Sequence, residues 1–224
     1  MIALLLDTST ERAFLALVQD GVIRSEKLLP IGYNHSKDIM VNVAHLFEDS
    51  GFCKNDLDFI GVAAGPGSYT GIRVGVTVAK TLSFALKKPL VGVSTLEGYE
   101  SKDEGAFAVL VDAKISGLYA IKASSKDGDI RYLCNHSVQP WDSIAQYLDG
   151  INNVLTPNSK RIAAVMSKKH PDLKVSWKEV YPDSLRFYNR AFELYQQGKY
   201  SLDGSLEIYY LRRTQAEIEG DVLN

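Results

Sequence analysis

Ala64-Gly65-Pro66-Gly67-Ser68-Tyr69-Thr70-Gly71-Ile72-Arg73-Val74-Gly75 is the stretch that decides the fold of this chain. The apolar run at 59–63 before it is typical of a buried strand, and apolar residues recur after it at helical spacing until Pro89. The order is therefore strand, glycine-rich turn, helix. This order predicts an α/β fold in which helices cover a sheet.

The glycine-rich turn has two interpretations that the sequence leaves open. Glycine tolerates positive φ, and it lets backbone N–H groups approach an anion at a helix N-terminus. Glycines also form tight turns and close contacts without any ligand. The spacing fits neither the Walker loop nor the dinucleotide fingerprint. The residues of this phosphate-binding or purely structural loop, together with the turn after the first strand, are Asp7, Thr8, Gly65, Gly67, Ser68, Gly71 and Arg73.

Composition narrows the class of protein. The 224 residues are 46% hydrophobic, enough for one large domain or two small ones, and the net charge of −2 gives no overall basic field for binding nucleic acid unaided. The two cysteines, Cys53 and Cys134, are too few and too far apart for a disulfide scaffold or a zinc site. The apolar start at 1–6 is too short for a membrane span. We expect a soluble cytoplasmic protein that has no membrane partner.

Elements are clearest in the first half. Strands are predicted at 2–6, 13–18 and 22–29, followed by a helix at 36–49 that Asn34 or Ser36 caps and Gly51 ends. After the glycine loop and its helix, another strand is predicted at 90–93. Two strand and helix units after three adjacent strands predict a mixed sheet with helical cover.

The polar segment 101–105 predicts a domain boundary, because the strand pattern restarts after it. We expect one domain at 1–103 and a smaller, related one at 104–224, whose last segment packs back on the first. Strands are predicted at 107–111, 118–123 and 130–138, and helices at 141–148, 158–166 and 183–197. Two strand-rich halves suggest an old duplication.

Three stretches carry a resemblance to a known family. The strand ending Leu6-Asp7-Thr8-Ser9-Thr10, the glycine loop, and Pro89-Leu90-Val91-Gly92-Val93-Ser94-Thr95-Leu96 resemble the bacterial TsaB (YeaZ) family. In the second half the match thins to Val111-Asp112-Ala113-Lys114 before Tyr119, and to Tyr210-Leu211-Arg212. The resemblance implies two related domains of the actin-like ATPase, sugar kinase and chaperone ATPase type.

The same resemblance implies a function. It points to a non-catalytic scaffold subunit of the complex that makes threonylcarbamoyladenosine next to the tRNA anticodon. The implied partners are the catalytic TsaD paralogue and the TsaE ATPase, with tRNA reached through the complex and a homodimer formed when the chain is alone. ATP is then used by the partners, and this chain is expected to need no cofactor of its own.

Catalytic alternatives fit the residues less well. The paralogue carries an H-x-x-x-H metal motif, and Thr95 and Tyr99 stand at those places here, so we expect no metal site. Asp7-Thr8 resembles the first phosphate turn of actin-like ATPases, which keeps an ATP-binding enzyme as an alternative, although such residues also close turns through their own backbone. A glycoprotease-like peptidase is disfavoured, because Ser68 lacks the G-x-S-x-G context.

The first two predicted helices indicate a partner-binding surface and not a catalytic site. The apolar set of the helix at 36–49 is wider than one sheet-facing stripe requires, and small residues on the second helix permit close helix approach. The resemblance implies that these helices pair with the same helices of a paralogue across a pseudo-twofold axis. The predicted partner interface consists of Ile39, Met40, Val43, Phe47, Ile72, Val76, Ala79, Lys80 and Ser83.

Overall fold

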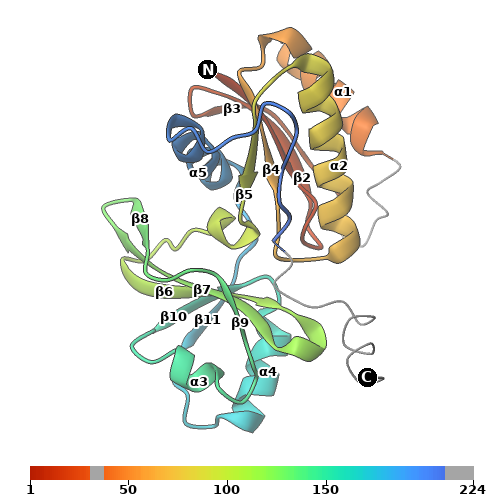
Figure 1. The fold of residues 1–224 in the computed structure, drawn as a ribbon. Helices are drawn as coiled ribbons and strands as arrows, with labels where there is room; N and C mark the ends of the chain where they lie inside the picture. Colours follow the sequence, from red (N-terminus) through yellow and green to blue (C-terminus); the bar gives the residue numbers. More distant parts are fainter. Residues whose placement is uncertain (31–37, 210–224) are drawn as a thin grey trace, which may run out of the picture. The chain divides into compact units, whose positions relative to one another are not determined.

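A computed structural model describes residues 1–30 and 38–209, and within these Ile115 has no described side chain. The chain forms two compact units (Figure 1). The first comprises Met1–Glu100 and Tyr181–Tyr209, and the second Ser101–Val180. The proposed helix caps Asn34 and Ser36 and the stretch 210–212 lie outside the described residues. The division at 103/104 remains a prediction, but 181–209 belongs to the first unit.

The first unit is built on a five-stranded mixed sheet. Its strands are β1 (Ile2–Asp7), β2 (Phe14–Gln19), β3 (Val22–Leu28), β4 (Phe59–Ala63) and β5 (Leu90–Val93). The order is β3-β2-β1-β4-β5; β1, β2 and β3 are antiparallel neighbours, and β4 and β5 run parallel to β1. The mixed sheet predicted for the first half is confirmed.

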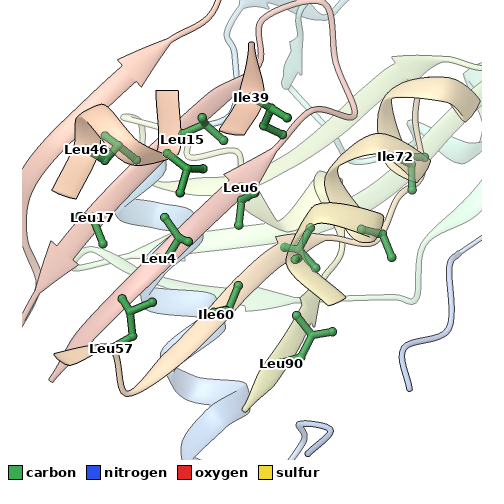
Figure 2. Close-up of a cluster of buried hydrophobic side chains, with 14 residues drawn as sticks. Leu4, Leu6, Leu15, Leu17, Ile39, Leu46, Leu57, Ile60, Ile72 and Leu90 are labelled. Carbon is green, nitrogen blue, oxygen red and sulfur yellow. The ribbon is translucent and has the colours of Figure 1, made fainter. Parts of the chain in front are cut away.

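Helices cover both faces of this sheet. Helices α1 (Ile39–Ser50) and α2 (Tyr69–Leu86) lie side by side on one face, and α5 (Ser184–Gln196) packs on the other (Figure 1). Successive residues of β1 point to opposite faces. Leu4 and Leu6 therefore join the core under α1 and α2 (Figure 2), whereas Ala3 and Leu5 pack with α5. Gly51 ends α1 in the left-handed conformation, as predicted.

The second unit contains a six-stranded sheet. Its strands are β6 (Gly105–Asp112), β7 (Leu118–Lys126), β8 (Asp129–Tyr132), β9 (Ser137–Gln139), β10 (Asn153–Thr156) and β11 (Ser176–Glu179). The path is β11-β10-β6-β7-β8, with β9 pairing β7. Helices α3 (Ile144–Tyr147) and α4 (Ser159–Lys169) bury Ile144, Ile162 and Met166 in the core of this unit.

The two units repeat one topology. In each, three antiparallel strands come first, and two later strands then add in parallel on the other side of the first strand. The expected fold of two related α/β domains with mixed sheets is confirmed. The repeated strand order is also what a duplication would leave.

The second half differs from the prediction in two places. Strands β10 and β11 were not predicted, because their sequences NVLT and SWKE are short and at least half polar, unlike the apolar LVGV of the equally short β5. The single strand predicted at 130–138 is two strands, β8 and β9, on different parts of β7.

Candidate functional site

The end of β1 is a buried polar turn. Asp7 is 0% exposed, and its Oδ1 accepts hydrogen bonds from the Ser9 backbone N–H (2.8 Å) and the Ser9 hydroxyl (2.5 Å). Thr95 Oγ1 in turn donates to Ser9 Oγ at 2.8 Å. Asp7 Oδ2 is buried without a hydrogen-bond partner among the described residues. Burial raises the pKa of Asp7 from 3.8 to about 6, although the two bonds from Ser9 oppose that shift.

The glycine loop packs directly against this turn. The Ser68 backbone N–H donates to the Ser9 carbonyl at 2.7 Å, and Thr8 Oγ1 donates to the Gly71 carbonyl at 2.7 Å. A Cβ atom at Gly71 would lie 2.0 Å from the Thr8 carbonyl oxygen, and one at Gly67 would lie 2.3 Å from that of Ser9. The glycines therefore allow two stretches of this chain to touch.

Those contacts bear on the two interpretations of the loop. The Ser68 hydroxyl accepts from the Gly71 N–H at 3.3 Å, so the N–H groups of Ser68 and Gly71 at the start of α2 both have protein partners. Gly65 has φ +100°, and its carbonyl accepts from the Thr95 N–H at 2.9 Å. The exposed Arg73 guanidinium lies over the Tyr69 ring, 3.9 Å from its centroid. This arrangement supports the structural interpretation over a phosphate cradle.

Thr95 and Tyr99, at the places where the resemblance would put metal ligands, both point into the protein. Thr95 is 0% exposed and Tyr99 is 1% exposed. Burial, and then the charge of Asp7, raise the pKa of Tyr99 well above its usual value. Within residues 1–30 and 38–209, no three His, Cys, Asp or Glu side chains are grouped as metal ligands would be. That the chain holds no metal remains a prediction.

The predicted partner interface needs correction. Most of its residues belong to the core beneath α1 and α2, because these helices turn their apolar stripes toward the sheet. In particular Val43, which was placed in the predicted interface, is 3% exposed. Met40 is 49% exposed, while Phe47 and Lys80 are half-buried. The buried members are Ile39, Val43, Ile72, Val76, Ala79 and Ser83.

A different apolar surface remains on the same helices. On α1, Met40 and Val41 are 49% and 52% exposed; on α2, Tyr69 and Phe84 are 44% and 78% exposed. The 18 residues of α2 include only two charged side chains, Arg73 and Lys80. Solvent-facing helices ordinarily carry many more charges. We call Met40, Val41, Tyr69 and Phe84 the exposed helix face. The scarcity of charge on α2 was the sequence signal for it.

Comparison with known proteins places the chain in a family. The family model described as TsaD, tRNA N6-adenosine threonylcarbamoyltransferase, matches residues 31–188, more than half of the chain. A protein named tRNA threonylcarbamoyladenosine biosynthesis protein TsaB from Bacillus subtilis is 37% identical over 129 residues, 54% of this chain and 56% of its own length. The protein of the same name from Escherichia coli is 34% identical over 123 residues, 52% of each chain. The chain thus spans about half the length of the curated relatives it matches.

Solved structures agree on the fold. An uncharacterized protein with similarity to peptidase YEAZ from Pseudomonas aeruginosa superposes with a TM-score of 0.80 at 23% identity, covering 94% of this chain and 99% of its own. The two α/β units share one mixed-sheet topology, and the TsaD family model matches more than half of the chain. Together these two findings define the class of protein. The chain belongs to the TsaB (YeaZ) family, within the wider family that the TsaD model describes.

Proposed function

We propose that this chain is a non-catalytic scaffold subunit in tRNA threonylcarbamoyladenosine biosynthesis. In this proposal it binds a TsaD-like catalytic paralogue and works with a TsaE-like ATPase in the cytoplasm, and it reaches tRNA through the complex. The names of its TsaB relatives and the TsaD family match support that role. No helix of the described residues is long and apolar enough to cross a membrane.

The exposed helix face is the observation that carries the proposal. Phe84 on α2 is 78% exposed and Met40 on α1 is 49% exposed, and Figure 1 shows both helices on the same side of the sheet. Such a surface lowers its free energy when it is covered by another apolar surface. A paralogue with the same fold presents equivalent helices, so that two helix pairs can pack about a pseudo-twofold axis. A second copy of this chain can use the same surface when the paralogue is missing.

The glycine loop argues against the ATP-binding alternative. Thr8 and Ser9 lie directly against Gly67 and Gly71, so the close approach that these glycines permit is already made by protein atoms. Asp7 holds Ser9 and has no second hydrogen-bond partner in the described chain that would orient it for magnesium. We therefore assign the turn a structural role.

Co-purification with the TsaD-like protein of the same organism tests the proposal. Met40→Asp and Phe84→Asp should fold normally and weaken partner binding by about a hundredfold, because each places an unpaired charge in an apolar interface. Leu133→Asp is the matched control, since Leu133 is 50% exposed but lies in the second unit.

Two results would contradict the proposal. One is a folded Phe84→Asp variant that binds the paralogue as tightly as the wild type, which would remove this surface from the interface. The other is stoichiometric ATP binding in a calorimetric titration that Asp7→Asn abolishes, which would restore the ATP-binding alternative.

A further inference from the structure

Helix α4 is a basic helix on a protein that has a net negative charge. Its sequence, SKRIAAVMSKK, contains four basic residues and no acidic one, whereas the whole chain carries −2. The helix packs on the sheet through Ile162 and Met166, which are 0% and 2% exposed. All four cations are on the solvent side of the helix and are exposed: Lys160, Arg161, Lys168 and Lys169.

Two of these cations have acidic partners and two do not. Arg161 forms an ion pair with Asp112, and Lys169 pairs with Asp142 at 2.5 Å. Within the part of the chain that the structure describes, Lys160 and Lys168 have no ion-pair partner. At 1.5 Å of rise per residue they stand about 12 Å apart along the helix axis. Ala164, four residues from each lysine, is small and exposed, so no large side chain stands between them on this side of the helix.

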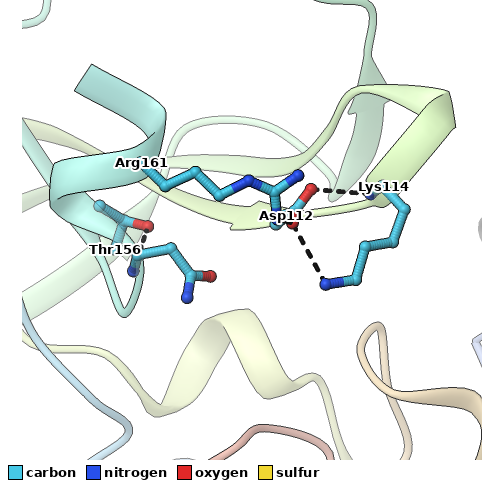
Figure 3. A network of polar contacts seen from close by, with 5 residues as sticks. Asp112, Lys114, Thr156 and Arg161 are labelled. Carbon is cyan, nitrogen blue, oxygen red and sulfur yellow. Dashed lines mark hydrogen bonds and ion pairs between the residues drawn. The ribbon is translucent and has the colours of Figure 1, made fainter. Parts of the chain in front are cut away.

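Another exposed cation, Lys114, lies near the start of the helix. Lys114, 62% exposed, lies 3.4 Å from the same Asp112 carboxylate that Arg161 contacts (Figure 3). One carboxylate thus serves two cations, and a second acidic group beside the first turn of α4, Glu179, accepts a hydrogen bond from the Ser159 hydroxyl at 2.7 Å. That turn contains no acidic residue, and Asn158 provides no side-chain cap. Cations at a helix N-terminus oppose the helix dipole, so this cluster gains stability when an anion is added.

We infer that α4 is an RNA-binding surface that contacts the sugar–phosphate backbone through Lys160, Lys168 and the Lys114–Arg161 cluster. Exposed lysines on one side of a helix attract RNA phosphates electrostatically, and such contacts do not depend on the base sequence. The RNA would be the tRNA of the proposed complex, and in that respect the inference rests on the proposed function. It goes further by assigning this subunit a direct contact, where the sequence suggested only an indirect one.

Charge reversal on α4 tests the inference with an unmodified tRNA transcript as the probe. The variant is Lys160→Glu/Lys168→Glu, and the control is Lys102→Glu/Lys126→Glu, which makes the same change in net charge at exposed lysines elsewhere in the second unit. Binding is measured over a series of salt concentrations, for the full chain alone and for its complex with the TsaD-like protein. The α4 variant should bind the tRNA at least about tenfold more weakly. The slope of its log binding constant against log salt concentration should decrease by the amount expected for about two lost phosphate contacts.

The control should stay within about twofold of the wild type. Equal loss in both variants would mean general attraction to charge and would overturn the inference, as would an α4 variant that behaves like the wild type. Binding of the wild type to phosphatidylserine vesicles in place of tRNA would overturn it too. Gel filtration of the wild type with the TsaD-like protein separates the two proposals. If the wild type does not associate with that protein, the scaffold role is contradicted, whereas tRNA binding by the chain alone still tests α4.

Discussion

At the scale of single residues, Asp7 shows how burial changes the chemistry of a side chain. A carboxyl group is costly to ionise away from water. Within the described chain, Ser9 offsets this cost for Asp7 through two hydrogen bonds to one carboxylate oxygen. The Asp7 side chain thereby closes the turn after β1. In the first unit it links the end of β1 to Thr95 through Ser9.

The raised pKa of Asp7 makes stability depend on pH. The folded protein holds this proton up to about pH 6, and the unfolded chain loses it near 3.8, so the contribution of Asp7 to stability is greatest below about pH 4 and is lost as the pH rises toward 6. The shift corresponds to about 3 kcal/mol in the free energy of unfolding. Asp7→Asn should remove this dependence, which urea unfolding of both proteins from pH 4 to 7 measures.

The exposed Asp149 provides the control, as Asp149→Asn. If the difference in unfolding free energy between wild type and Asp7→Asn stays constant across this pH range, Asp7 does not titrate as its burial requires.

At the scale of elements, the glycine loop is held by contacts with the turn after β1. Gly71 lies on the first turn of α2, where its carbonyl accepts from Thr8 and its own Cβ position is filled by the Thr8 carbonyl. The helix can approach β1 this closely only with glycine there.

Gly71→Ala should therefore lower the free energy of unfolding by about 2 kcal/mol or more, as overpacking does, in spite of the better helix propensity of alanine. Thr77→Ala, on the exposed side of the same helix, should change stability by less than about 0.5 kcal/mol. Thermal melts compare the two. A Gly71→Ala variant as stable as wild type would mean that the loop has room for a ligand.

At the scale of the whole molecule, the chain leaves its first unit at Glu100 and returns to it at Tyr181. The returning α5 covers the sheet face that α1 and α2 leave open. Phe187, fully buried, meets Phe14 edge to face with ring centroids 5.6 Å apart. The first unit therefore completes its core with residues from the far end of the sequence.

Phe187→Ala should lower the free energy of unfolding by about 3–5 kcal/mol. Hydrogen exchange should accelerate in β1 and β4 of the first unit and stay unchanged in β6 and β7 of the second. Leu185→Ala is the control, because Leu185 is 36% exposed on the same helix. Faster exchange confined to α5, with β1 still protected, would show that the sheet is stable without this cover.

The sequence by itself determined much of the first unit. Long periodic runs and turn signals such as Gly51 depend on local geometry, so they predicted the strands, both helices and the mixed sheet. The glycine loop, together with the opening strand, also predicted the family. The short strands β10 and β11 were not predicted, because NVLT and SWKE are at least half polar and too short to show a strand period, whereas the equally short β5 is an apolar run.

Only the tertiary structure decided which apolar side chains are exposed to solvent. Val41 and Val43 are the same residue type on one helix, yet the first is 52% exposed and the second 3%. Residues two apart on a helix point to opposite sides, and the packing of α1 on the sheet decides which side is buried. Likewise, the sequence alone does not show that Thr8 and Ser9, distant from the glycine loop in sequence, pack against its glycines. Propensity is local, whereas burial depends on what the rest of the chain brings to the site.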